Sequence, residues 1–331
     1  MNTHILNIDE NSLKICKKII SEGGAVAFPT ETVYGLGANA FDDTAVNNIF
    51  KIKGRPNDNP LIVHVHQDYD ISNLVCNIPD YAVKLAKTYL PGPLTMVYKS
   101  KGKVSSAVSC GLDTLAIRVP EHKGAQEFLK YVNLPIAAPS ANISKHVSPV
   151  TAEHVYSDLN GKIQVILDGG KCSGGIESTV LDCTGDVPTI LRSGLITQEM
   201  ISAVAGDCLV YIPKDGEKVK SPGMKYKHYS PNCDTMLYEL SELDKALETY
   251  DKFLAEGIKV CFLCDEITSK LIGGRNFLNL GKDGKDIASN LYLKLREGEK
   301  NFQMLIAVAP QDKSGVMVGV MNRLTKACKN K

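Results

Sequence analysis

The sequence predicts an α/β fold with two sheets, a large twisted sheet followed by a small parallel sheet of Rossmann-like type. Up to about Asp207, short apolar runs typical of strands are interrupted by amphipathic helical segments, which indicates one α/β domain. After Asn232, helices and short apolar strands alternate again, which favours a small parallel sheet. The stretch between these two parts has neither period. We therefore divide the chain into a first domain at 1–207, a linker at 208–232 and a small domain at 233–331.

Periodicity and turn residues place the individual elements. Residues 11–21 put Leu13, Cys16 and Ile19 on one helical face, and two glycines then end the helix. Further helices of the first domain are expected at 45–53, 81–89, 125–131 and 152–159, and strands at 25–30, 61–66, 94–100, 115–120, 135–140, 165–170, 177–183 and 189–194. The small domain is expected to have helices at 240–256, 283–297 and 316–327, and strands at 258–264, 276–281 and 305–310.

Composition narrows the class of protein. The 38 basic and 37 acidic side chains give a net charge of +1, which argues against a large basic surface for nucleic acid. No run approaches the ~20 apolar residues of a membrane span, and the first residues do not resemble a signal peptide, so we expect a cytoplasmic protein. The ten cysteines are scattered, as reduced thiols usually are. Cys261 and Cys264 have metal-ligand spacing, but they lie in an apolar run that predicts a buried strand, and we assign no metal to them.

The linker is unusual for a simple tether. It is rich in Lys, Pro, Gly and Tyr, and a structureless segment of this length is usually either disordered or functional. Tyr226, His228 and Tyr229 place three rings among basic residues, which a solvated spacer rarely contains. We therefore expect the linker to be a functional lid.

A cationic loop follows the second expected helix. Lys51, Lys53 and Arg55 flank Gly54, and prolines stiffen the residues after them. Such a loop can hold phosphates through charge and bidentate guanidinium bonds, but the same cations also stabilise a helix C-terminus. No P-loop motif is present, so both interpretations stay open at this point.

A second polar segment lies earlier in the chain. Gly35 and Gly37 are expected to form a tight loop after the strand at 25–30, with Thr32 and Tyr34 available as hydrogen-bond partners. Taken alone, this segment is expected to be an ordinary glycine turn between a strand and a helix.

Polar side chains recur on one side of several expected strands. Alternation puts His64 and His66 on one face of their strand, although a single histidine on a sheet face is usually just solvated. The same alternation places Thr114 with Arg118, Ser140 with Asn142, and Ser178 and Arg192 opposite apolar neighbours. Together these residues could form one polar, partly cationic face that suits an anionic substrate. Since no motif supplies a nucleophile with a paired base, we expect chemistry that depends on holding substrates and neutralising charge.

These segments together resemble one known family. In order along the chain they read PTETVYGLG, KGRPNDNPLIVH, LAIRVP, PSAN, ESTV and LRSG. They closely resemble the YrdC-like threonylcarbamoyl-AMP synthases, whose KxR and SxN signature stands here as Lys53-Gly54-Arg55 and Ser140-Ala141-Asn142. The linker sequence SPGMKYKHYSP resembles that of the long, two-domain members. Asn39 and Ile52 depart from the expected Asp and Ala.

The resemblance implies a concave ligand cavity on the large sheet and a reaction that joins L-threonine, bicarbonate and ATP into L-threonylcarbamoyl-AMP, for threonylcarbamoyladenosine in tRNA. The residues implied around threonine are Thr32, His64, Arg118, Ala138 and Ser178. Those implied to hold ATP are Arg55, Asn59, Thr114, Ser140, Ser148, Arg192 and Tyr229. Lys53, Arg55, Ser140 and Asn142 are the implied catalytic residues. Mg²⁺ is expected to arrive on the ATP phosphates, with no metal held tightly by the protein, and the product would pass to the tRNA threonylcarbamoyl transferase machinery.

Two other functions remain as alternatives. A carbamoyl-transferring maturation enzyme shares the YrdC-like part, but it carries zinc-finger cysteines that this sequence lacks. A non-catalytic RNA-binding module would use the cationic face as a groove, and the near-zero net charge disfavours it. ATP consumption that requires both threonine and bicarbonate would distinguish the synthase from a pure binder.

Overall fold

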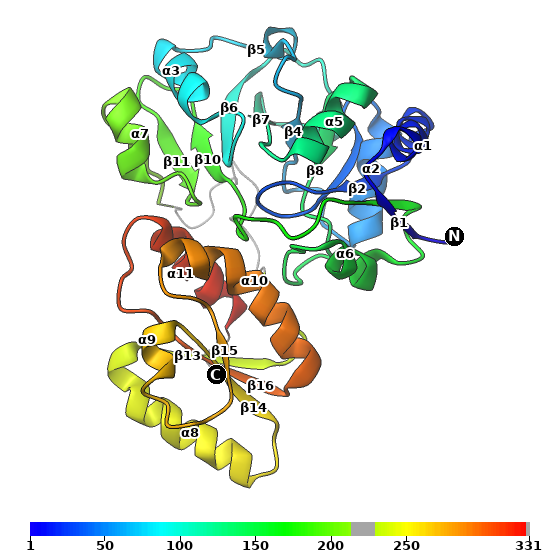
Figure 1. Ribbon diagram of the computed structural model, residues 1–331. Coiled ribbons are helices and arrows are strands. Elements are labelled where there is room, and N and C mark those ends of the chain that lie inside the picture. Colours follow the sequence, from blue (N-terminus) through cyan, green and yellow to red (C-terminus); the bar gives the residue numbers. More distant parts are fainter. Residues whose placement is uncertain (213–228, 329–331) are drawn as a thin grey trace.

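The computed structural model describes residues 1–212 and 229–328, and these form two α/β domains, one above the other in Figure 1. The first domain contains a mixed sheet in the order β1-β9-β2-β3-β8-β4-β7-β6-β10-β11-β12, with β5 paired to β6. The second contains a four-stranded sheet in the order β13-β16-β14-β15, in which every pair is parallel. The predicted fold of a large sheet followed by a small parallel sheet is therefore confirmed.

The strands of the large sheet are β1 (His4–Asn7), β2 (Val26–Phe28), β3 (Gly35–Asn39), β4 (Ile62–His64), β5 (Val75–Cys76), β6 (Leu94–Ser100), β7 (Thr114–Arg118), β8 (Ile136–Ala138), β9 (Val165–Asp168), β10 (Thr179–Asp182), β11 (Thr189–Arg192) and β12 (Leu209–Val210). Its helices are α1 (Glu10–Ser21), α2 (Asp43–Lys53), α3 (Asp80–Tyr89), α4 (Ser106–Ser109), α5 (Lys123–Val132), α6 (Ala152–Leu159) and α7 (Gln198–Ala205). The large sheet thus continues to Val210, beyond the domain end predicted at Asp207.

The second domain is built from β13 (Asp234–Tyr238), α8 (Leu243–Ala255), β14 (Val260–Cys264), α9 (Glu266–Ser269), β15 (Phe277–Asn279), α10 (Gly284–Asn301), β16 (Met304–Val308) and α11 (Val316–Ala327). Both faces of its sheet are buried. Cys261 and Leu263 pack on the face that α10 and α11 cover, whereas Phe262 and Cys264 pack on the opposite face. The two cysteines of the CxxC pair therefore lie on opposite sides of one strand.

The two faces of the large sheet differ. One face packs Val63, Leu115 and Ile117 into the main core. On the other, α1 and α5 cover the β2 and β9 end through a separate core that includes Phe28 and Phe128. The rest of this second face carries only a small apolar patch of Ile62, Val97, Ala116, Val180 and Leu191. This half of the face is where a polar cavity can form.

The glycine segment after β2 differs from its prediction. Instead of a loop, Gly35 and Gly37 belong to β3, which pairs antiparallel with β2 and with β8. A Cβ on Gly37 would lie 2.5 Å from Cγ2 of Ile136 and 2.8 Å from Cε1 of Phe28. The glycines are therefore explained by the close packing of side chains over the strand. In a sequence, a glycine needed for close packing looks the same as a glycine needed for a turn.

The second domain packs against the first through α10 and α11, with α8 on the far side (Figure 1). Arg296 of α10 donates to both carboxylate oxygens of Asp158 in α6, at 2.8 and 2.9 Å. His146 contacts Asp158 on one ring nitrogen and Glu299 of α10 on the other. Gly175 brings the two backbones close, since a Cβ there would lie 2.3 Å from the carbonyl oxygen of Ala288. Charge pairs and close backbone packing together fix the domain interface.

Candidate active site

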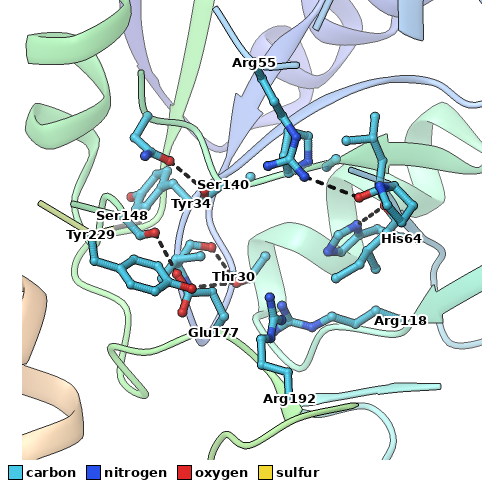
Figure 2. Close-up of a pocket in the computed structure, with 18 of the residues that line it drawn as sticks. Thr30, Tyr34, Arg55, His64, Arg118, Ser140, Ser148, Glu177, Arg192 and Tyr229 are labelled. Carbon is cyan, nitrogen blue, oxygen red and sulfur yellow. Dashed lines mark hydrogen bonds between the residues drawn. The ribbon is translucent and has the colours of Figure 1, made fainter. Parts of the chain in front are cut away.

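A polar cavity opens on the half-covered face of the large sheet (Figure 2). About 670 Å³ of its space is not occupied by atoms, part of it open to solvent. Among the described residues, three arginines, Arg55, Arg118 and Arg192, line it. The other lining residues are Thr30, Val33, Tyr34, Gly35, Pro60, Leu61, Ile62, His64, Ala138, Pro139, Ser140, Asn142, His146, Ser148, Glu177 and Tyr229.

Arg192 reaches the cavity because of an irregularity in β11. Val180 pairs with Arg192 while the next residue, Leu181, pairs with Ile190, so that Leu191 is an extra residue in the β10–β11 ladder. Such a bulge turns two consecutive side chains towards the same side of a sheet. Leu191 accordingly joins the apolar patch of the cavity face, and Arg192 lines the cavity and donates to the carbonyl oxygen of Ser178 from Nε at 3.1 Å.

Arg55 enters the cavity from the end of α2. Gly54 adopts a left-handed conformation as the helix cap, and the chain then turns so that Nη2 of Arg55 donates to the carbonyl oxygen of Asn59 at 3.1 Å. Burial lowers the pKa of Arg55 to about 10, which leaves it a cation at neutral pH. Its Nε is buried with no hydrogen-bond partner, as are both side-chain polar atoms of Asn59. Partnerless buried groups are rare in folded proteins and call for an explanation.

Lys53 does not line the cavity. Its Nζ is buried and donates to the carbonyl oxygens of Ser140, at 2.5 Å, and of Asn142, and it lies 3.3 Å from Oδ1 of Asn142. Burial lowers the pKa of Lys53 well below its usual value. Ser140 in turn donates to Oδ1 of Asn142 at 2.5 Å. The lysine thus holds the loop that presents Ser140 and Asn142 to the cavity.

His64 and Arg118 lie side by side, because β4 and β7 are neighbouring parallel strands in which these two residues are paired. The expectation that a single histidine on β4 would be solvated is wrong, because β4 is a central strand and its side chains are covered: His64 is 4 % exposed and His66 is 9 % exposed. Burial, aided by the positive charge of Arg118, lowers the pKa of His64 to about 3, so its ring is neutral. Nη2 of Arg118 donates to Glu31 at 2.8 Å, while its Nε is buried without a partner.

Several sequence-predicted residues lie outside the lining. Thr32 is fully buried beside Thr30, whose hydroxyl lies 2.9 Å from its own. Ser178 lies behind the cavity surface, 2.8 Å from the hydroxyl of Thr95. Asn59 is buried, and Thr114 is half-buried at the start of β7. In the linker, Tyr226 and His228 fall outside the described residues, whereas Tyr229 is described, is 5 % exposed and lines the cavity.

Sequence reasoning assigned no site role to several residues that line or support the cavity, among them Glu31, Tyr34, His146 and Glu177. Glu31 and Glu177 stand inside motifs that were singled out, but carboxylates are not expected beside an anionic substrate. Tyr34 was considered only as a loop residue, and its hydroxyl donates to the carbonyl oxygen of Gly170 at 2.8 Å. His146 had no sequence signal, since its partners Asp158 and Glu299 are distant along the chain.

In residues 1–212 and 229–328, no three His, Cys, Asp or Glu side chains are grouped so that they could hold a metal ion. Within the same ranges, no helix is both long enough and apolar enough to cross a membrane.

Comparison with known proteins places both domains. The Sua5/YciO/YrdC family, described as telomere recombination, matches residues 18–194, and the C-terminal domain of threonylcarbamoyl-AMP synthase matches residues 196–328. A threonylcarbamoyl-AMP synthase of Pyrococcus abyssi is 42 % identical over 97 % of this chain and 95 % of its own length. One from Bacillus subtilis is 39 % identical over 98 % of this chain and 95 % of its own.

A solved structure supports the same assignment. The crystal structure of Pyrococcus abyssi Sua5 complexed with L-threonine superposes with a TM-score of 0.90 at 40 % identity, covering 98 % of this chain and 97 % of that one. The fold, both family matches and the full-length similarity agree. The chain belongs to the Sua5/YciO/YrdC family, in its two-domain form with the C-terminal domain of threonylcarbamoyl-AMP synthase.

Proposed function

We propose that this protein is an L-threonylcarbamoyladenylate synthase and therefore a nucleotidyltransferase. It would combine L-threonine, bicarbonate and ATP into L-threonylcarbamoyl-AMP, with diphosphate and water as the other products. The observation that carries the proposal is one cavity, in a chain of this family, that gathers Arg55, Arg118 and Arg192 with the neutral ring of His64. The tRNA threonylcarbamoyl transferase machinery would then use the product.

The reaction has two steps, carbamate formation and transfer of the adenylyl group. The threonine amine adds to the carbon of bicarbonate, water leaves, and a carbamate forms on nitrogen. An oxygen of that carbamate then attacks the α-phosphorus of ATP, and the bond from this phosphorus to the β-phosphate oxygen breaks to release diphosphate. Nucleotidyl transfer requires in-line positioning and charge neutralisation more than a protein nucleophile. A cavity rich in guanidinium groups meets that requirement.

The side chains divide between the two ends of the reacting assembly. Arg118 would face the threonine carboxylate, because a guanidinium matches a carboxylate and its Nε is buried without a partner. His64, neutral and on the neighbouring strand, would lie beside threonine as a hydrogen-bonding group. Ala138 lines the same part of the sheet through its pairing with Ile62.

The ATP end would be held by the remaining cations and hydroxyls. Arg55 and Arg192 would neutralise the phosphates, and Ser140 and Ser148 line the cavity with them. Mg²⁺ would enter as part of the Mg·ATP substrate and stabilise charge on the leaving diphosphate. Asn59 lies behind the lining, where its carbonyl oxygen accepts from Nη2 of Arg55, and it would act by holding that guanidinium.

The test is to incubate the protein with Mg·ATP, bicarbonate and one amino acid at a time, and to identify the adenylate by mass spectrometry. We expect an adenylate with threonine that disappears when either threonine or bicarbonate is omitted. Valine, which replaces the hydroxyl by a methyl group, should react very poorly, because a site that hydrogen-bonds a hydroxyl rejects analogues that lack it. Formation of the valine product at a comparable rate would contradict the threonine assignment, and the absence of any adenylate would contradict the function.

A further inference from the structure

A carboxylate lies where the proposed function needs positive charge. Glu177, just before β10, is 7 % exposed and lines the cavity (Figure 2). Ser148, one of the residues placed at the ATP end, donates its hydroxyl to Oε1 of Glu177 at 2.7 Å. An ionised carboxylate this close would repel the triphosphate unless another group neutralised it.

Two side chains of the second domain bind this carboxylate, and one of them is a cation. Nε of Arg323 in α11 donates to Oε2 of Glu177 at 3.1 Å. The hydroxyl of Tyr292 in α10 lies 3.0 Å from the same oxygen and 3.2 Å from Oε1. Arg323 is fully buried, and it also donates to the carbonyl oxygen of Ser193 at 2.5 Å. The carboxylate of Glu177 is therefore held by one hydroxyl of the first domain and two side chains of the second.

The same two side chains also hold Tyr229. The rings of Tyr229 and Tyr292 are stacked with their centroids 5.4 Å apart. The guanidinium of Arg323 lies 6.0 Å from the centroid of the Tyr229 ring. Tyr292 and Arg323 thus contact both a cavity-lining carboxylate and a cavity-lining ring without lining the cavity themselves.

We propose that Arg323 and Tyr292 are positioning residues of the active site: Arg323 neutralises Glu177, and both side chains hold its carboxylate away from the phosphates of ATP. ATP binding would then depend on the packed second domain, although this domain supplies none of the described lining residues. This inference rests on the proposed function, because it takes the anion in the cavity to be ATP.

A second buried ion pair at the interface provides the contrast. Arg296 and Asp158 are 4 % and 3 % exposed and join the same two domains, but neither lines the cavity. Removing one partner of a buried pair is strongly destabilising, because the charge that remains is poorly compensated. Loss of Arg296 should therefore loosen the interface, whereas loss of Arg323 should in addition leave a charge beside ATP.

The charge of Glu177 gives the proposal a pH signature. Burial alone would raise the pKa of Glu177, but Arg323, Arg192 and Ser148 outweigh it and bring the pKa down to about 2. Without Arg323, less opposes the effect of burial, which raises the pKa of Glu177. The carboxyl therefore takes up a proton at a higher pH. A defect caused by the carboxylate should then shrink as the pH falls. The titratable and charged groups that face Glu177 are Arg323 and Lys326 of α11, Tyr292 of α10, Arg192 of β11 and Tyr229.

The experiment measures KM for ATP, KM for threonine and kcat in the full-length protein, with ATP affinity by calorimetry. For R323M we expect KM for ATP to rise about tenfold, equivalent to about 1.4 kcal/mol, with a smaller change in KM for threonine. The rise should be largest at pH 8.5 and smaller at pH 6. In the double variant E177Q/R323M, KM for ATP should return to within about threefold of the wild-type value. R296M is the matched control, and adding E177Q to it should restore nothing.

The rescue by E177Q decides whether Arg323 acts through the charge of Glu177 or only through packing. If E177Q fails to rescue R323M, or rescues R296M equally, Arg323 acts only through packing and the proposal is wrong. If R323M does not fold, Y292F takes its place, since it removes one donor to Glu177 and keeps the stacked ring; a smaller rise in KM for ATP that E177Q removes is expected, and no rise overturns the proposal. Wild-type protein that binds no ATP and makes no adenylate would overturn the proposed function as well. A wild-type enzyme that makes the adenylate while the rescue fails would overturn this inference alone.

Discussion

The two domains contribute to the cavity in different ways. All the described lining residues belong to the first domain or to Tyr229, and they include every arginine that faces the cavity. The second domain contacts the cavity lining from behind: Tyr292 and Arg323 hold Glu177 and contact Tyr229, and Glu299 contacts His146. The first domain therefore presents the groups that would contact substrates, while the second controls the electrostatics of a group among them.

The sheets explain this difference. In the large sheet, one face is half covered by α1 and α5, and polar side chains occupy the remainder. In the small sheet, β14 and β16 bury apolar side chains on both faces, with Leu263 and Ala307 on one and Phe262 and Ile306 on the other. Parallel strands covered on both faces have no polar face to offer. The second domain can therefore act on the cavity only through helices α10 and α11.

The largest expected effect comes from separating the two domains. Removing one partner of the Arg296–Asp158 pair in R296M should lower the free energy of unfolding by about 3–5 kcal/mol, because the buried carboxylate then keeps only the His146 ring as a charge partner. In D158N/R296M the poorly compensated charge is gone and the loss should be clearly smaller. Urea unfolding of the three proteins measures both values. Equal losses in the single and double variants would mean that the carboxylate is not buried as described.

The next effect tests the first domain's side of the comparison. Arg55→Met should lower kcat/KM for ATP by about 100–1000-fold, as removal of a preorganised charge-stabilising donor typically does. Its stability should change little, because losing the Nη2 hydrogen bonds to the carbonyl oxygens of Asn59 and Pro60 is offset by relief of the desolvation cost of a buried cation. Lys87→Met is the control, since Lys87 is an exposed cation in the last turn of α3. Comparable kinetic losses in both variants would remove Arg55 from the phosphate site.

Much of the fold could be predicted because its signals are local. The helix at 316–327 was predicted with the bounds that the structure shows, and Gly54 ends α2 as expected. Short strands with weak patterns were not found: β1 and β13 lie at the edges of their sheets, where all four residues of β1 and four of the five of β13 are exposed or partly exposed. The glycines of β3 could not be predicted either, since their reason is the ring of Phe28 across the sheet.

The site was predictable where alternation along a strand decides which way a side chain faces. Alternation placed His64 and Arg118 each on the polar side of its own strand, and they line the cavity together; that they share one site was implied by the family resemblance. Arg192 reaches the same face through a bulge, which its sequence does not signal. Glu177 and Arg323 could not be paired from sequence, because their contact depends on how the two domains pack. Local sequence patterns predict which face of a strand a side chain occupies, but they do not predict which residues meet where two domains pack.

A smaller effect is expected from a change that disturbs the interface without altering charge. Gly175 has a φ of +72°, and a Cβ there would lie 2.5 Å from Cα of Ser289 in α10. Gly175→Ala should therefore lower the free energy of unfolding by about 1–3 kcal/mol through overpacking and backbone strain. Gly102→Ala is the matched control: its φ is +66° and nothing lies within 4 Å of the added carbon. Thermal unfolding of both variants separates the steric clash at Gly175 from the backbone strain that both positions share. Equal shifts in Tm would show that the two backbones are not in close contact.

The smallest effect concerns His146, which lies between Asp158 of the first domain and Glu299 of the second. Burial opposes its charge, but hydrogen bonds to both carboxylates outweigh burial and raise the pKa above 6.5. The protonated ring therefore stabilises the fold below pH 6.5, and this contribution is lost as the pH rises through the raised pKa. In His146→Gln the contribution is absent, so the difference in stability between wild type and variant should fall by about 1 kcal/mol between pH 6 and pH 9.

Comparing wild type with His146→Gln cancels the contributions of the other titrating groups, because both proteins contain them. Burial lowers the pKa of His64 to about 3 and of His154 to about 4, so these rings destabilise the fold only as the pH falls below 6.5. Burial lowers the pKa of Lys326 to about 8, which raises stability as the pH increases from there and partly masks His146 in the wild type alone. The charged groups that face His146 are Asp158, Arg296 and Glu299. A difference that stays constant across this pH range would mean that His146 is neutral at the interface, and that the Arg296–Asp158 pair holds the domains together without it.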